Sequence, residues 1–208
     1  MASEPHRLSM IRSYTAADLL TLGNASCGTI SIFLCLGYIA DDRSGEIRAA
    51  FILPVVALAL DVLDGYVGRL DTRRRSRLGA DLDSLADIVS FGVAPAVLGY
   101  TLGLRGMWDV VCLTWFVCCG ISRLARFNVT ADSLTNVATG KVRYFEGTPI
   151  PTSLLLVLMM AVVHGTGLSG PEFWPGRWIV LEKVFHPFSV LFAISGSLMI
   201  STIKIPKP

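Results

Sequence analysis

Charged residues are scarce in this chain. Only 16% of its 208 residues are Asp, Glu, Lys or Arg, whereas 52% are hydrophobic and the mean hydropathy is +0.59. A typical soluble domain carries about 25% charged residues, so the composition argues against an ordinary soluble protein. Internal repeats, low-complexity tracts and long linkers are absent from the sequence. We therefore expect one domain over residues 1–208, and no nucleic-acid partner.

The residues of several common active sites are also few. The three histidines are scattered away from any acidic cluster, which argues against a histidine base. The five cysteines lie in apolar stretches without a Cys-x-x-Cys spacing, so they are interpreted as small buried hydrophobic residues rather than metal ligands or disulfides. Residues 1–18 lack the unbroken apolar core of a cleavable signal. They fit a short N-terminal amphipathic helix at a membrane interface, with a frayed terminus as the alternative.

Long apolar segments make up most of the chain. A helix needs about 20 apolar residues to cross a bilayer, and six segments come close to this length. They are residues 19–40, 49–70, 79–102, 107–127, 150–168 and 184–203. The sequence therefore predicts an all-α integral membrane protein with six transmembrane helices in one bundle.

Basic residues are distributed unevenly over the predicted topology. Six spans place thirteen of the eighteen basic residues on the side that holds both termini, and five on the other side. The thirteen are Arg7, Arg12, Arg69, Arg73, Arg74, Arg75, Arg77, Arg123, Arg126, Lys141, Arg143, Lys204 and Lys207. Because positive charge concentrates in cytoplasmic loops, both termini are predicted to be cytoplasmic, beside a basic face suited to lipid headgroups or phosphates.

Four carboxylates interrupt the apolar pattern. Asp61 and Asp64 are spaced i, i+3, and Asp83 and Asp87 are spaced i, i+4, so each pair lies on one face of its helix. A charged residue inside a membrane helix costs roughly 2.5–3.5 kcal/mol on insertion scales. Two helices that meet across the Arg-rich turn would bring the pairs together, where only positive charge could offset their repulsion. The pattern predicts a site for two divalent ions, Mg²⁺ or Mn²⁺, with oxygen ligands.

The neighbours of the aspartates suggest a phosphate substrate. Paired divalent ions commonly clamp the oxygens of a phosphoryl displacement. Gly65, Gly68 and Gly79 remove side chains where a bulky ligand would approach, and Arg69 follows Asp64 by about one turn. We expect a nucleotide diphosphate here. A solvated, salt-bridged turn between helices is the alternative explanation for part of the charge.

The full spacing resembles the signature of the CDP-alcohol phosphotransferase family. Here it reads Asp61-x-x-Asp64-Gly65-x-x-Gly68-Arg69, then nine residues, then Gly79-x-x-x-Asp83-x-x-x-Asp87. The family usually has Ala at the position of Gly68 and about eight residues in the gap. The extra residue falls in the Arg-rich turn and leaves open which arginine faces the ligand.

The resemblance implies a fold, a reaction and residue roles. It implies a six-helix membrane enzyme, usually a homodimer, that transfers a phosphatidyl group from a CDP-linked lipid to an alcohol and releases CMP. The four aspartates would hold two divalent ions, and Asp87 would also be the base for the acceptor hydroxyl. Asp64, Gly65, Gly68, Arg69 and Gly79 would form the CDP site.

Other segments indicate which alcohol is accepted. Residues 83–96, 122–129 and 140–152 together resemble the serine-using branch of the family, the phosphatidylserine synthases of the bacterial and fungal type. The opening at 21–28 and the tail at 203–208 add to the likeness. The resemblance implies CDP-diacylglycerol and L-serine as substrates. It also implies an endoplasmic reticulum membrane if the source is eukaryotic, or an inner membrane if it is prokaryotic, with the active site facing the cytoplasm.

Residues of both charge signs near the end of the fourth span suit the serine zwitterion. Arg123 and Arg126 are candidates for the serine carboxylate because arginine binds carboxylates in a bidentate manner, and Glu146 or Asn128 for the ammonium. Lys141 lies close by in the sequence. Each arginine could instead mark the cytoplasmic side and contact lipid phosphates. Synthases that use glycerol 3-phosphate or inositol, and a divalent-cation transporter, are the alternative functions.

Overall fold

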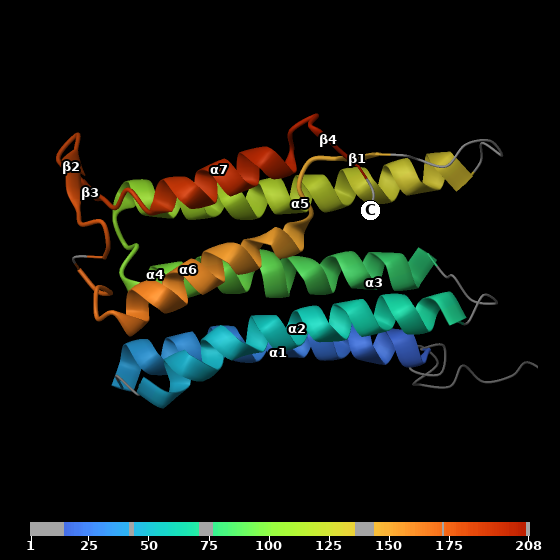
Figure 1. Ribbon diagram of the computed structural model, residues 1–208, viewed down its shortest axis with the longest axis horizontal. Helices are drawn as coiled ribbons and strands as arrows, with labels where there is room; N and C mark the ends of the chain where they lie inside the picture. The colour runs from blue at the N-terminus through green and yellow to red at the C-terminus, as the bar shows by residue number, and fades with distance from the viewer. Residues whose placement is uncertain (1–14, 42–43, 71–76, 136–143, 172, 207–208) are drawn as a thin grey trace, which may run out of the picture.

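The computed structural model describes residues 15–41, 44–70, 77–135, 144–171 and 173–206. Within these residues, four helices are long and apolar enough to cross a membrane, over Ala16–Asp41, Gly45–Gly68, Leu78–Leu102 and Met107–Val129. They run along the long axis of the molecule (Figure 1). The longest, α5 (Met107–Thr135), has 29 residues and is therefore about 43 Å long, more than the roughly 30 Å of a bilayer's hydrocarbon core. The predicted all-α membrane class is confirmed at this level.

The first helix, α1 (Ala16–Asp41), begins at a reciprocal cap. The Thr15 backbone N–H donates to Asp18 Oδ2 at 2.7 Å, and the Asp18 N–H donates to Thr15 Oγ1 at 3.3 Å. This pairing is a capping box, which satisfies backbone donors that a helix start leaves open. Of the predicted N-terminal amphipathic segment, residues 1–14 lie outside the described chain, and residues 16–18 belong to α1.

The third long helix changes its geometry halfway. It consists of α3 (Arg77–Asp87), a six-residue π-helical segment η2 (Ile88–Val93) and α4 (Ala94–Leu102). The Ala94 N–H donates to Val89 O, a five-residue spacing. Pro95 follows directly, and because it lacks an N–H and its ring crowds the preceding turn, a wider turn before it is expected. The π-helical segment starts immediately after Asp87.

The last two apolar segments form shorter helices than predicted. A 3₁₀ turn, η3 (Ile150–Ser153), leads into α6 (Leu154–Gly165), and α7 covers only Ser189–Met199. The predicted helix over 184–203 is therefore wrong at both ends. At its start, the His186 N–H donates to Asp109 Oδ1 at 2.8 Å instead of joining a helix, and Pro187 has no N–H to donate.

Two short antiparallel ribbons complete the described chain. In one, β2 (Trp178–Val180) pairs with β3 (Lys183–Phe185) beyond one end of the helices (Figure 1). In the other, β1 (Tyr144–Glu146) pairs with β4 (Lys204–Pro206), so the C-terminal tail is tied to the segment before α6. The sequence did not predict either ribbon.

The core of the bundle is aromatic at one end and close-packed by small residues along α1. Phe116 of α5 meets Phe192 of α7 edge to face, with ring centroids 5.3 Å apart, a favoured aromatic geometry.

Helix α2 (Ser44–Leu70) lies beside α1. Gly28 of α1 lies against Ser90, where an added Cβ would come 2.7 Å from the Ser90 Cα. This close approach holds α1 against the helix that carries Asp87.

Candidate metal and phosphate site

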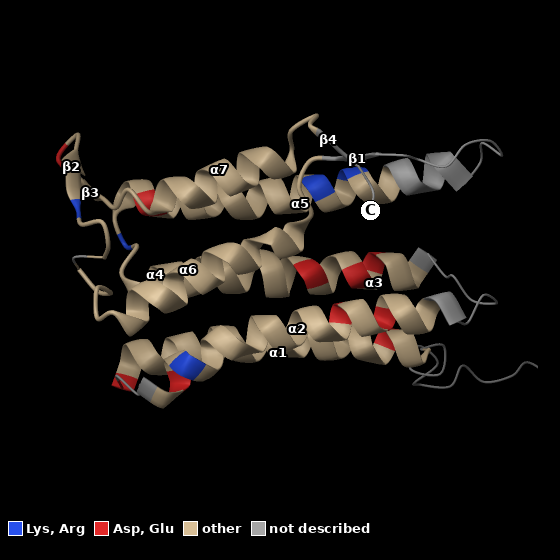
Figure 2. Cartoon of the chain, in the orientation of Figure 1, with Lys and Arg blue, Asp and Glu red and all other residues tan. Residues whose placement is uncertain are grey.

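Three of the predicted aspartates form a compact group. Carboxylate oxygens of Asp61, Asp83 and Asp87 all lie within 4.8 Å of one another. Asp61 comes from α2, whereas Asp83 and Asp87 are one turn apart on α3. Figure 2 shows acidic residues of α1, α2 and α3 close to one another toward one end of the bundle, and further acidic residues of α1 and α2 at the opposite end. The helices therefore bring Asp61 together with Asp83 and Asp87, as the spacing predicts for these three residues.

Asp64 lies outside this group of three but belongs to the same electrostatic cluster. It is only 8% exposed, and its Oδ2 accepts a hydrogen bond of 2.7 Å from the Thr21 hydroxyl of α1. Its charge acts on both Asp83 and Asp87. The Thr21 hydroxyl thus fixes Oδ2 of Asp64 from the neighbouring helix.

Asp87 is also held from α1. The Asn24 side-chain amide donates to Asp87 Oδ1 at 3.2 Å, and the Asn24 backbone carbonyl accepts a bond of 2.8 Å from the Ser90 hydroxyl. Asn24 is fully buried and Asp87 is 8% exposed. One bond reaches Asp87, just before the π-helical segment, and the other reaches Ser90 within that segment. Both therefore join α1 to the third long helix. The bond from the Asn24 amide orients the Asp87 carboxyl group.

The donor set fits divalent cations. Asp83 Oδ1 is buried and has no hydrogen-bond partner among the described residues, although a buried polar oxygen normally has one. Several carboxylates sharing a poorly solvated space repel one another strongly. Hard cations such as Mg²⁺ take carboxylate oxygens as ligands, so an ion would satisfy the unpaired oxygen and offset the repulsion together.

The residues predicted for the nucleotide flank the aspartates. Gly65 and Gly68 lie on α2 after Asp64, and Gly79 lies on α3 before Asp83. A Cβ at Gly68 would meet no protein atom within 4 Å, so packing within the described chain does not require glycine there. The Arg69 side chain lies outside the described part of the structure.

Arg123, one of the residues predicted for serine, interacts electrostatically with one of the four aspartates. It lies on α5, is partly buried, and is within electrostatic range of Asp87. Its buried Nε has no hydrogen-bond partner among the described residues. Arg126, three residues further along α5, is exposed. The two arginines therefore differ in position, which the sequence could not show.

Among the three remaining serine candidates, the structure describes the side chain of Asn128 only. Asn128 accepts from the Ser84 hydroxyl at 3.2 Å and donates to Asp81 Oδ1 at 3.4 Å, so it links α5 to α3. Glu146 is in β1, with its side chain outside the described part, and Lys141 lies outside the described residues altogether.

Sequence reasoning missed the contribution of α1. Thr21 and Asn24 reach two of the four aspartates, yet they lie about 40 and 60 residues before them in the chain. Thr21 and Asn24 are spaced i, i+3, so they lie on one face of an apolar helix. Polar residues on one face of a membrane helix commonly mark a functional site, and this pattern could have indicated their role. Asp18 shares this helix, is also buried, and acts electrostatically on Asp64.

Comparison with known proteins agrees with this geometry. Residues 14–195 match the sequence profile described as CDP-alcohol phosphatidyltransferase. A CDP-diacylglycerol–serine O-phosphatidyltransferase from Saccharomyces cerevisiae is 43% identical over 99% of this chain and 75% of its own length.

Two prokaryotic relatives are also similar over most of the chain. A protein of the same name from Helicobacter pylori is 35% identical over 93% of this chain and 72% of its own length. An archaetidylserine synthase from Methanothermobacter thermautotrophicus is 34% identical over 91% of this chain and 69% of its own length. The chain therefore belongs to the CDP-alcohol phosphatidyltransferase family, as the spacing of its aspartates predicts.

Proposed function

We propose that this protein is a CDP-diacylglycerol–serine O-phosphatidyltransferase, which transfers the phosphatidyl group of CDP-diacylglycerol to the hydroxyl of L-serine and releases CMP. The observation that carries the proposal is the meeting of Asp61, Asp83 and Asp87 on two apolar helices, in the family's spacing. The choice of serine rests on the names of the relatives, which align over most of this chain. The proposal includes a single membrane domain over residues 1–208.

The proposed setting is a membrane that the chain crosses six times, with both termini and the aspartates on the cytoplasmic side. Four apolar helices of sufficient length and two shorter ones support this arrangement. The thirteen-to-five distribution of basic residues supports the orientation. The membrane would be that of the endoplasmic reticulum in a eukaryote or the inner membrane in a prokaryote. We expect a homodimer, as in the family.

The aspartates are proposed to bind two divalent ions and the diphosphate of the lipid substrate. Asp61, Asp64, Asp83 and Asp87 would hold Mg²⁺ or Mn²⁺, which when bound stabilises the negative charge on phosphate oxygens during a displacement. Gly65, Gly68 and Gly79 leave room beside them for CDP, and the open space at Gly68 supports this role. Arg69 would contact the diphosphate.

Asp87 is proposed to accept the proton of the serine hydroxyl. Asn24 binds Oδ1 of Asp87, whereas Oδ2 has no hydrogen-bond partner among the described residues and can take that proton. The serine oxygen then forms a bond to the lipid-bearing phosphorus as the bond from that phosphorus to the CMP phosphate breaks. A positioned base typically contributes 10²–10⁴-fold to such a step. No covalent enzyme intermediate is required.

Arg123 is the proposed ligand of the serine carboxylate. It approaches Asp87 from α5, and its buried, unpartnered Nε supports a role in binding an anion. Arginine and a carboxylate form strong, directional hydrogen bonds. Arg126, Asn128, Lys141 and Glu146 would complete the serine site.

An acceptor comparison tests the proposed reaction. The protein is purified in detergent and given CDP-diacylglycerol with Mg²⁺ or Mn²⁺ and one acceptor at a time: serine, glycerol 3-phosphate or inositol. CMP release with serine alone is the expected result. Release only with another acceptor would keep the family and refute the serine assignment. Metal uptake into liposomes without any CMP release would favour the alternative of a divalent-cation transporter.

A further inference from the structure

A second polar region lies at the opposite end of the bundle. There, a cavity of about 470 Å³ is lined by the junction of α4 and α5, the loop after α6, and β3. Thr101, in its lining, is fourteen residues beyond Asp87 on the same helix, a separation of about 20 Å. The cavity is therefore separate from the aspartate site.

The cavity is lined by basic groups. Arg105, Arg177 and His186 line it, together with the Ser169 hydroxyl, and its described lining contains no carboxylate. Positively charged side chains around a partly enclosed space raise the local concentration of anions. The lining therefore favours an anionic ligand.

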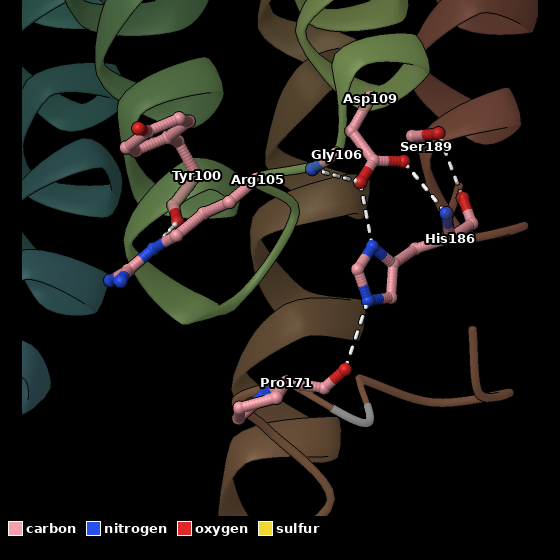
Figure 3. A network of polar contacts seen from close by, with 7 residues as sticks. All are labelled: Tyr100, Arg105, Gly106, Asp109, Pro171, His186 and Ser189. Carbon is pink, nitrogen blue, oxygen red and sulfur yellow. Dashed lines mark hydrogen bonds and ion pairs between the residues drawn. The ribbon is translucent and has the colours of Figure 1, made fainter. Parts of the chain in front are cut away.

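A buried network forms one wall of the cavity (Figure 3). His186 is 2% exposed; its Nδ1 is 2.6 Å from Asp109 Oδ2, and its Nε2 is 3.2 Å from Pro171 O. Both ring nitrogens of His186 therefore lie within hydrogen-bonding distance of oxygen atoms in this wall. Asp109 also accepts from the backbone N–H of Gly106 at 2.8 Å. The Asp109 carboxylate thus accepts two backbone hydrogen bonds in addition to its contact with the His186 ring.

Arg105 is held in place without a carboxylate partner among the described residues. Its Nε and Nη2 donate to the carbonyl oxygens of Tyr100 and Thr101, each at 3.1 Å, at the C-terminal end of α4. The guanidinium carbon lies 5.6 Å from the centre of the Tyr100 ring. These contacts use Nε and Nη2 and fix the guanidinium group, whereas Nη1 takes part in neither bond. Arginine in this arrangement suits phosphate recognition.

An apolar ribbon lies next to the cavity. β3 contributes Val184 to the cavity lining. The turn and strand that precede it expose Trp178 at 61%, Ile179 at 77% and Leu181 at 78%. Tryptophan beside exposed aliphatic residues is typical of the interface between membrane and water. The ribbon therefore favours a ligand that arrives from a lipid surface.

We propose that this cavity binds a phosphate-bearing anion, the headgroup of an anionic phospholipid, through Arg105 and Arg177. The site is independent of the transfer reaction because it lies at the other end of the bundle. Free inorganic phosphate shares the same recognition chemistry, and the test separates the two sources.

Binding of defined lipids to the full chain tests the proposal. Native mass spectrometry of the detergent-purified protein measures the affinity for phosphatidylglycerol, with phosphatidylcholine as the neutral lipid. A chelator is present so that the metal-free aspartates repel anions. We expect tight binding of phosphatidylglycerol alone, and at least a tenfold weaker affinity in the double variant Arg105→Gln/Arg177→Gln. Lys183 is exposed on β3 but does not line the cavity. Lys183→Gln therefore removes a nearby charge and should change the affinity less than twofold.

The variants also guard against misfolding. Because Arg105 bonds two carbonyl oxygens, Arg177→Gln alone serves as a milder change, with an expected loss of about threefold, and the thermal midpoint of each variant is compared with that of the wild type. Inorganic phosphate is titrated in parallel. Phosphate binding that needs both arginines, without lipid binding, would keep the anion site and overturn the lipid source. Equal binding of phosphatidylglycerol by the folded double variant and the wild type would overturn the proposal.

Discussion

Replacing Asn24 by leucine should slow the reaction without disrupting the fold. The change removes the amide that donates to Asp87 Oδ1 at 3.2 Å, and keeps the volume of a fully buried side chain. The backbone carbonyl of residue 24 can still accept from the Ser90 hydroxyl. The effect should therefore be confined to the position and charge of the Asp87 carboxyl group.

The size of the effect follows from the kind of bond that is lost. A hydrogen bond to a charged group contributes about 1.5–3 kcal/mol. Since each 1.36 kcal/mol corresponds to a tenfold change in rate, kcat should fall by about 10- to 150-fold. The concentration of Mn²⁺ that gives half-maximal activity should rise as well, because Asp87 is also a proposed ion ligand.

The assay is serine-dependent CMP release over a range of Mn²⁺ concentrations. Thr29→Val is a matched control, since the Thr29 hydroxyl bonds Ala25 O of its own helix, and its kcat should stay within twofold of the wild type. Size-exclusion profiles and thermal midpoints verify folding. A folded Asn24→Leu protein with wild-type kcat and unchanged Mn²⁺ dependence would refute a positioning role for Asn24.

Three further predictions follow from the same geometry. Asp87→Asn should lower kcat by about 10²–10⁴-fold through loss of the base, and turnover close to wild type in a folded variant would exclude that role. Arg123→Gln should raise the KM for serine by about tenfold or more. Replacement of the exposed Arg126 by Gln should change this KM less than threefold. Equal changes of KM in the two variants would argue against Arg123 as the ligand of the serine carboxylate. Gly28→Ala should lower the thermal midpoint, because overpacking costs about 1–3 kcal/mol. Gly45→Ala should not lower it, because a Cβ there meets nothing within 4 Å. Equal thermal midpoints in these two variants would contradict the close contact between α1 and Ser90.

The grouping of three aspartates was predictable because helical spacing determines much of their geometry. Asp83 and Asp87 share a helix face by their i, i+4 separation alone. Asp61 joins them because α2 ends and α3 begins at the same end of the bundle (Figure 1). The family resemblance, confirmed by the match over residues 14–195, depends on the same spacing.

Other features depend on contacts between distant segments, which local patterns do not encode. Asn24 and Asp87 are 63 residues apart, and neither neighbourhood in the sequence points to the other. The apolar run at 184–203 suggested a full helix, but the bond from the His186 N–H to Asp109, 77 residues away, holds its first residues outside the helix. The ribbon between β1 and β4 similarly pairs Phe145 with Ile205.

The most direct test of the central claim is the metal dependence of phosphatidylserine formation from CDP-diacylglycerol and labelled serine. The wild type and Asp83→Asn are each assayed after treatment with a chelator and again after Mn²⁺ or Mg²⁺ is restored. We predict that the chelator abolishes phosphatidylserine formation, that restored ions recover it in the wild type, and that they do not recover it in the folded variant. Formation of phosphatidylserine by the chelated wild type, or by Asp83→Asn at the wild-type rate, would contradict the assignment of the aspartates as the catalytic metal site.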